Sequence, residues 1–167
     1  MTIIITDTNV FIDLIRSGAL SHFFQLNYEI CTTDLVVEEV KVPEQQQQLE
    51  TFQANGRLKI IPLESAEIRD AVQMPTRWEL KGIVDRTVLL KAIHLQCMVL
   101  SGDGNLRKEC EHRGLEVHGS IWVIREIWRT NLAETEYLLE MLDALGGNRR
   151  LPEKELEKLR REIARGE

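Results

Sequence analysis

The sequence contains little cysteine, and its cysteines lack the spacing of a metal-binding or disulfide framework. Three cysteines occur in 167 residues, with no CxxC motif among them. We therefore predict that Cys31, Cys97 and Cys110 are buried, reduced thiols. The four histidines, at positions 22, 94, 112 and 118, form no HxxxH or HExxH pair. These absences argue against a zinc site.

Long apolar runs are also missing. No stretch approaches the roughly 20 apolar residues that a membrane span needs. The apolar run at the N-terminus ends at Asp7 and has no basic region before it, unlike a signal peptide. We therefore expect no membrane partner and a cytoplasmic protein. The length of 167 residues, with 43% apolar and 29% charged residues, fits one globular domain spanning residues 1–167.

An excess of positive charge is absent too. The formal net charge is -6, which as a total disfavours a polyanionic partner, because phosphate binding needs local positive charge. The distribution is uneven, since residues 149–167 carry seven basic against five acidic side chains. Any nucleic acid would therefore have to bind a local basic surface or a site that holds cations.

The apolar pattern alternates between short strands and helices. This order predicts a three-layer α/β/α fold with a central parallel sheet of about five strands, covered on both faces. We expect a core over about residues 1–121 and a helical C-terminal extension over about 122–167. The expected strands are 2–6, 28–32, 57–63, 97–101 and 115–118; the expected helices are 9–26, 33–41, 65–74, 83–96, 104–113, 120–130, 132–145 and 152–165.

Four carboxylates occupy positions where an apolar or turn residue is expected. Asp7 directly follows the first strand, and Asp103 follows the fourth between two glycines. Asp85 is followed at i+3, i+4 and i+7 by apolar residues, so it shares the apolar side of its helix. Glu39 follows Leu35 and Val36 at helical spacing, and we expect it on the apolar side as well. Each acid taken alone could be a helix cap or a turn residue.

Together these acids indicate a site. The carboxyl ends of parallel strands open into one crevice, and helices enter the same edge by their N-termini. The four carboxylates could therefore converge there. Like charges in a partly buried site repel, and protonation or cation binding must relieve that repulsion. An all-oxygen ligand set favours a hard divalent ion such as Mg²⁺ or Mn²⁺.

At these residues the sequence resembles the PIN domain family. The four blocks that carry the resemblance are IIITDTNVFIDL, TTDLVVEEV, GIVDRTVLLKAI and VLSGDGNLRKECEHRGLEVHG. They follow in the family's order over residues 2–121, and the helical tail resembles the extension of prokaryotic members. Two departures stand out: Gly82 replaces the small hydroxyl residue of many members, and Glu38 beside Glu39 leaves the alignment of the second block uncertain by one residue.

The resemblance implies a site and an activity. Asp7, Glu39, Asp85 and Asp103 would hold one or two Mg²⁺ or Mn²⁺ ions, with Ser101 and Asn9 as polar supports of the catalytic set. The implied activity is that of a metal-dependent endoribonuclease, with RNA as substrate. Many small prokaryotic members are toxins of VapC-like toxin–antitoxin pairs, so a cognate antitoxin protein is an expected partner, and a homodimer is a second one.

Two other functions stay open at this point. A PIN-like scaffold that binds RNA or protein without cutting it would keep the same fold. A haloacid-dehalogenase-like phosphatase also places an Asp after its first strand, but it requires a second Asp two residues later, where this chain has Asn9. Basic residues close to the site blocks in sequence are candidates for phosphate contacts: Arg16, Arg86, Arg107 and Lys108.

Overall fold

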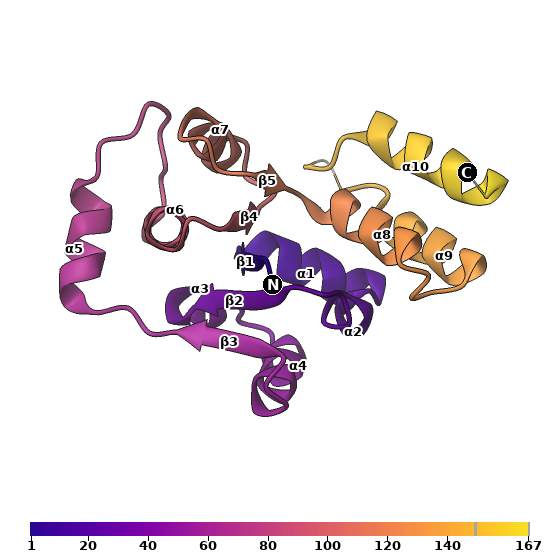
Figure 1. The fold of residues 1–167 in the computed structure, drawn as a ribbon, viewed down its shortest axis with the longest axis horizontal. Coiled ribbons are helices and arrows are strands. Elements are labelled where there is room, and N and C mark those ends of the chain that lie inside the picture. Colours follow the sequence, from indigo (N-terminus) through magenta and orange to yellow (C-terminus); the bar gives the residue numbers. More distant parts are fainter. Residues whose placement is uncertain (149, 167) are drawn as a thin grey trace.

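A five-stranded, all-parallel sheet with the order β3-β2-β1-β4-β5 forms the centre of the protein. The computed structural model describes residues 1–148 and 150–166 (Figure 1). This sheet between two layers of helices confirms the predicted three-layer α/β/α fold. The strands are β1 (Ile3–Thr6), β2 (Glu29–Thr33), β3 (Leu58–Ile61), β4 (Met98–Leu100) and β5 (Val117–His118).

The helices begin and end close to the predicted positions, with two differences. The predicted helix 9–26 is two helices, because Gly18 adopts a left-handed conformation (φ 77°) that ends the first one. A helix over Pro43–Ala54 was not predicted. The helices are α1 (Thr8–Ser17), α2 (Leu20–Phe23), α3 (Asp34–Glu39), α4 (Pro43–Ala54), α5 (Ser65–Gln73), α6 (Ile83–Leu95), α7 (Gly104–His112), α8 (Ser120–Arg129), α9 (Thr135–Leu145) and α10 (Glu153–Arg165).

The order of the strands explains the layers. From β1 the chain proceeds outward to β2 and β3, then crosses back past β1 to β4 and β5. Because crossovers between parallel strands are almost always right-handed, this reversal places α6 and α7 on the opposite face from the helices of the first half. In agreement, α6 packs on β1 and β2, and α7 packs on β5, whereas α1 packs against α8 and α9. The point of reversal lies between β1 and β4.

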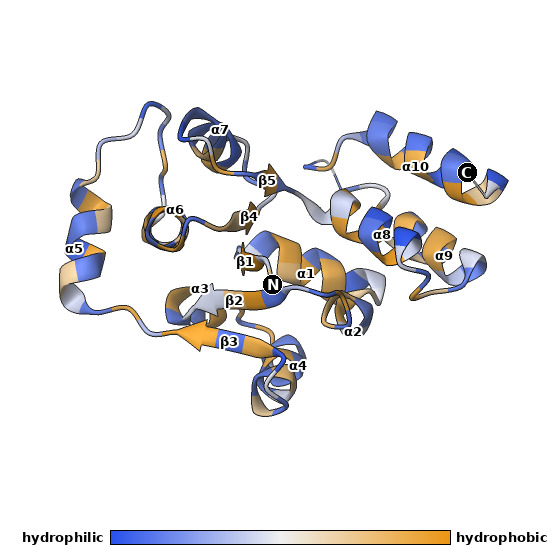
Figure 2. Cartoon of the chain, viewed as in Figure 1, coloured by the Kyte–Doolittle hydropathy of each residue, from blue (hydrophilic) through white to orange (hydrophobic). Residues whose placement is uncertain are grey.

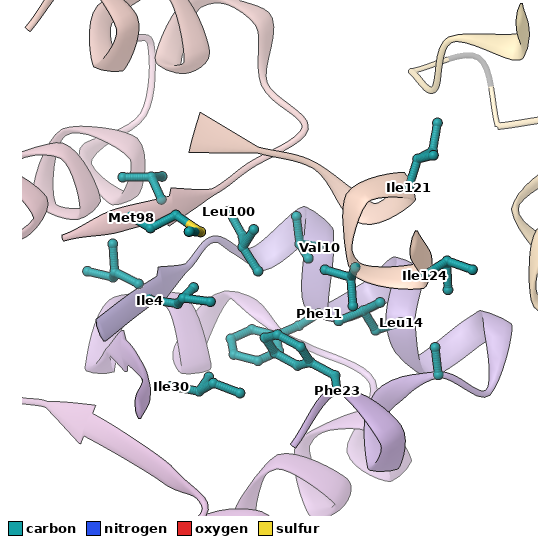
Figure 3. Packing of buried hydrophobic residues seen from close by; sticks show 14 of the residues in the cluster. Ile4, Val10, Phe11, Leu14, Phe23, Ile30, Met98, Leu100, Ile121 and Ile124 are labelled. Carbon is teal, nitrogen blue, oxygen red and sulfur yellow. The ribbon is translucent and has the colours of Figure 1, made fainter. Parts of the chain in front are cut away.

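Apolar side chains of α1 and α2 fill the space beside the sheet. Val10, Phe11 and Leu14 of α1 and Phe23 of α2 are all 0% exposed and lie near Ile4 of β1 (Figure 3). Each such side chain contributes roughly 1.5–3 kcal/mol when it is fully buried. This packing holds the start of α1, and therefore Asp7, firmly against the end of β1.

The C-terminal helices pack onto α1 and onto one another. α9 contacts α1 and α8, and α10 contacts α8 and α9. In α10, Leu156, Leu159 and Ile163 form the buried stripe and the remaining surface is mostly hydrophilic (Figure 2). The 3- and 4-residue spacing of this stripe is that of an amphipathic helix lying on a protein surface.

Two predictions about buried thiols and membranes can be compared with the structure. Cys31, Cys97 and Cys110 are all buried and free, as predicted. Across residues 1–148 and 150–166, every helix is too short or too polar to pass through a lipid bilayer.

Candidate functional site

Asp7 lies buried at the junction between β1 and α1. Its side chain is 1% exposed, and its Oδ1 accepts a hydrogen bond of 2.8 Å from the backbone N–H of Thr8. The Asp7 N–H donates to the carbonyl of Leu100 at 2.9 Å, which continues the pairing of β1 with β4. Asp7 is therefore a helix cap and also an acidic group inside the protein. It lies between β1 and β4, where the chain changes the direction in which it adds strands to the sheet.

Ser101 and Asp103 lie beside Asp7 at the end of β4. Ser101 Oγ donates to Asp7 Oδ2 at 2.9 Å and accepts from the Asp103 N–H at 3.1 Å. Asp103 caps α7, since its Oδ1 accepts from the Leu106 N–H at 2.8 Å. The buried Ser101 hydroxyl thus connects the two aspartates through one short chain of hydrogen bonds.

Asp85 lies in the first turn of α6 and is half-buried. Burial is the main reason that its pKa rises to about 7, and the negative charges of Asp7, Asp103 and Glu39 raise it further. Burial likewise raises the pKa of Asp7 to about 6, although hydrogen bonds from Ser101 and Thr8 lower it; Glu39 and Asp103 add to the rise. The four carboxylates therefore interact electrostatically at one edge of the sheet.

Glu39 is the site residue whose surroundings differ from the prediction. The expected position on the apolar side of its helix is wrong, because Glu39 is exposed, as is Glu38. The physical reason is the length of the helix: α3 has six residues and Glu39 is its last, before Val40 turns to an extended conformation. From the end of this short helix, the charge of Glu39 still acts on Asp7 and Asp85 and raises their pKa values.

Asn9 occupies the rim of the same corner. Gly102 separates Ser101 from Asp103, and a Cβ atom built on Gly102 would lie 3.9 Å from Asn9 Cβ and 3.9 Å from a guanidinium nitrogen of Arg150. The segment from Ser101 to Asp103 is therefore bordered by α1 on one side and by the C-terminal extension on the other. The structure shows no hydrogen bond from the Asn9 side chain to the other site residues that it describes.

The donor set suits a hard cation, although the carboxylates are not drawn into a tight cage. In the described part of the chain, no three His, Cys, Asp or Glu side chains lie close enough to form a metal site as they stand. A carboxylate has about four lone-pair positions, and the hydrogen bonds on Asp7 and Asp103 leave some of these free. Thr8 Oγ1, next to Asp7 in the chain, is buried without a hydrogen-bond partner among the described residues. These unused acceptors fit an oxygen-liganded divalent ion.

The basic residues that were candidates for phosphate contacts differ in their surroundings. The guanidinium of Arg86 donates to the carbonyls of Leu80, Ala71 and Met74 at 2.9–3.2 Å. Arg86 therefore holds the connection between α5 and α6, and its use in a phosphate contact was a wrong interpretation. Arg16 and Lys108 are exposed, whereas Arg107 is half-buried.

Asp13 was not singled out from the sequence. It is 3% exposed; its Oδ2 accepts from Ser120 Oγ at 2.8 Å and its Oδ1 from Asn148 Nδ2 at 3.1 Å. Arg150 lies 3.5 Å from the same Oδ1. An acid three residues after the buried Val10 could have revealed Asp13, but its partners lie more than a hundred residues away and could not be predicted.

This chain is similar in sequence to one protein family and in structure to solved proteins. Residues 3–165 match the family model described as DUF3368, a PIN domain. Among solved structures, a PilT N-terminus domain protein from the hyperthermophilic archaeon Sulfolobus solfataricus shows 10% identity and a TM-score of 0.48, covering 75% of this chain and 93% of its own. VapBC2 from Rickettsia felis, bound to a DNA fragment from its promoter, shows 19% identity and a TM-score of 0.48, covering 71% of this chain and 98% of its own.

The sequence match is the informative comparison. A search of curated proteins finds no match to this chain, and likeness to solved structures at 10% and 19% identity concerns the fold alone. The family model, in contrast, covers nearly the whole chain. The predicted resemblance is confirmed: this chain belongs to the PIN domain family.

Proposed function

We propose that the protein is a nuclease that hydrolyses RNA phosphodiester bonds with a bound Mg²⁺ or Mn²⁺ ion. The observation that carries the proposal is the meeting of Asp7 and Asp103 at the ends of β1 and β4, where Ser101 Oγ connects them by hydrogen bonds. Burial and neighbouring carboxylates raise the pKa values of Asp7 and Asp85 at this edge to about 6 and about 7. Part of each rise comes from the neighbouring carboxylates. A cation would relieve this repulsion, and membership of the PIN domain family supports the same chemistry.

Each site residue has a role within this proposal. Asp7, Asp85 and Asp103 would bind the cation directly, and Glu39 would complete its surroundings from the exposed end of α3. Ser101 fixes the orientation of Asp7 through its 2.9 Å hydrogen bond, and Asn9 would contact the substrate at the rim. When bound, the cation would activate a water molecule and offset the charge that develops on the phosphate. A histidine base is then unnecessary.

Cleavage of a single-stranded RNA in Mn²⁺ or Mg²⁺ tests the proposal. The wild type should give products with a 5′-phosphate and a 3′-hydroxyl, and Asp85→Asn should lose this activity. Glu38→Gln is the matched control, because Glu38 is exposed and lies next to Glu39. Equal cleavage by the wild type and Asp85→Asn would show that the nuclease came from another protein in the sample.

The non-catalytic scaffold is the second candidate, and one observation favours it. Within residues 1–148 and 150–166 the carboxylates do not already form a compact metal cluster. A titration with Mn²⁺ separates the two functions, because a ligand that binds the folded state stabilises it by RT ln(1 + [L]/Kd). The nuclease requires Mn²⁺ to raise the melting temperature of the wild type more than that of Asp85→Asn. An unchanged melting temperature in millimolar Mn²⁺ favours the scaffold.

A partner belongs to the same proposal. As a VapC-like PIN protein, the chain would act as the toxin of a pair, inhibited by an antitoxin encoded beside it. Its expression alone should slow bacterial growth, and co-expression of a small neighbouring reading frame should restore growth and give a complex that purifies as one species. Growth inhibition that persists unchanged in Asp85→Asn would contradict toxicity through nuclease action.

A further inference from the structure

A cavity of about 300 Å³ lies next to the acidic site, at the carboxyl end of β5. It is bordered by the connection from β5 to α8, by Arg107 of α7, and by the first turns of α10. Figure 1 shows this connection running from beside α7 toward α8 and α10. The volume is at the lower end of the roughly 300–1,000 Å³ found for small-molecule sites.

In the cavity wall, the guanidinium of Arg107 packs closely against the backbone at Gly119. Gly119 has an extended backbone (φ -120°, ψ -168°) that any residue could adopt. A Cβ atom at Gly119 would lie only 3.0 Å from a guanidinium nitrogen of Arg107 and 3.7 Å from the carbonyl oxygen of Ser101. A side chain at this position would press on the end of Arg107, so the glycine provides space and is not needed for backbone conformation. Its lack of a side chain lets Arg107 lie against the segment that carries Ser101.

Arg107 also differs from the other cations of the cavity, because within residues 1–148 and 150–166 it forms no ion pair. Arg125 forms an ion pair of 2.6 Å with Glu162, and Lys158 lies 4.0 Å from the same glutamate. Glu155 is the acid that lines the cavity. Among the residues that the structure describes, no carboxylate lies within 4.0 Å of Arg107. A half-buried guanidinium without a counter-ion can bind an anionic ligand strongly.

An aromatic pair completes the cavity. His118 and Trp122 stack with ring centroids 4.5 Å apart and an interplanar angle of 6°. His118 Nε2 hydrogen-bonds with Glu116 Oε1 at 2.8 Å, and the ring of Tyr28 packs against Trp122 with the centroids 5.8 Å apart. Flat rings fixed in this way are the usual platforms for nucleic-acid bases in single-stranded sites.

The cavity and the acidic site share backbone. The Ser101 N–H donates to the His118 carbonyl at 3.0 Å, and the Arg107 N–H donates to the Asp103 carbonyl at 3.0 Å. Arg107 thus lies one helical turn after Asp103. A strand whose phosphate reached the carboxylates would therefore have its neighbouring nucleotide within reach of the cavity.

We propose that this cavity binds the nucleotide adjacent to the scissile phosphodiester, with Arg107 contacting its phosphate and the His118–Trp122 pair lying beside its base. The proposal rests on the nuclease function and adds a substrate subsite to it. It also explains how a protein with a net charge of -6 can hold a polyanion. The cation at the acidic site and Arg107 beside it supply the local positive charge.

Binding of RNA without cleavage tests the subsite. A fluorescein-labelled single-stranded RNA is titrated with the protein in Ca²⁺, a hard divalent ion that takes oxygen ligands, and its anisotropy is followed at several salt concentrations while a gel checks that the RNA stays intact. Arg107→Gln should raise Kd about tenfold to hundredfold, the loss expected for one charged phosphate contact, and should lower the salt slope by about 0.7. The matched control is Lys59→Gln, the same charge change at an exposed residue of β3, at the opposite edge of the sheet from β5, which should change Kd less than about threefold.

Two further variants keep the test independent of protein stability. Gly119→Ala displaces only the flexible end of Arg107, so it should weaken RNA binding while leaving the melting temperature within a few degrees of the wild type. His118→Ala should weaken binding with little change in salt slope, because it removes stacking and no phosphate contact. Equal Kd values for the wild type, Arg107→Gln and Gly119→Ala would overturn the subsite.

The nuclease and the subsite can fail separately. If wild-type protein cleaves RNA in Mn²⁺ but Arg107→Gln binds RNA as Lys59→Gln does, the nuclease stands and the subsite is refuted. If no cleavage occurs and Arg107→Gln still weakens binding, the subsite stands as part of an RNA-binding scaffold.

Discussion

Replacing Asp7 by Asn should stabilise the protein in the absence of metal. The substitution removes a buried charge but keeps the shape of the side chain. Asn is as good a helix cap as Asp, so its Oδ1 can still accept from Thr8, and its amide can donate to Ser101 Oγ. The substitution therefore loses little hydrogen-bonding energy. It gains stability because a neutral side chain is buried in place of a charge that neighbouring carboxylates repel.

The pKa of Asp7 sets the size of this gain. The value rises from 3.8 to about 6 on folding, so the folded state binds protons more tightly than the unfolded state. The stabilisation by the protonated form is complete below about pH 3.8 and is lost as the pH rises through about 6. The loss is at most about 3 kcal/mol, from 1.36 kcal/mol for each pKa unit. Asp7→Asn should avoid this loss above pH 6.

Urea unfolding in EDTA at pH 5, 6.5 and 8 measures the effect. The difference in the free energy of unfolding between Asp7→Asn and the wild type should grow with pH. In a thermal melt at pH 8, the melting temperature of Asp7→Asn should be higher by up to about 6–12 °C for a chain of this size. Glu38→Gln, at an exposed position, should show no such trend. A variant that is less stable than the wild type at pH 8, or equally shifted at every pH, would refute the electrostatic account of the site.

Three other substitutions test how the site is supported. Glu109 is fully buried and accepts the backbone N–H groups of Arg77 and Trp78, so Glu109→Ala should lower the free energy of unfolding by about 3–5 kcal/mol in urea. Asp13→Ala should raise the rate of proteolysis between residues 146 and 152, since it removes the acceptor that holds this loop. Arg86→Met should cost about 1–3 kcal/mol because several backbone carbonyls lose their donor; a loss below 0.5 kcal/mol would contradict its structural role.

The strands could be predicted because the sequence around them is locally consistent. Isoleucine-rich or β-branched runs such as residues 3–6 and 58–61 lie between polar turns, and the observed strands fall within one or two residues of the prediction. The positions of Asp7 and Asp103 follow from this, since Asp7 directly follows β1 and Asp103 lies three residues after the end of β4. The order of the sheet then places them at one edge.

The remaining features depend on contacts that no local pattern contains. The exposure of Glu39 follows from where α3 stops, and α4 has a polar, glutamine-rich sequence with one buried residue, Leu49. The cavity requires α10 to lie over the start of α8, and helix-to-helix packing of this kind is set by side chains far apart in sequence. The role of Arg86 became clear only when the carbonyls of the preceding connection were located.

The first helix, α1, depends on the C-terminal part of the chain, which supplies the hydrogen-bond donors of the buried Asp13. This carboxylate lies one turn after Asn9 and uses Ser120 and Asn148 as its hydrogen-bond donors. A chain shortened at residue 145 would lose Asn148 and Arg150 and leave that charge half satisfied, four residues from the rim of the acidic site. Trimming the tail to simplify the protein would therefore disturb the acidic site as well.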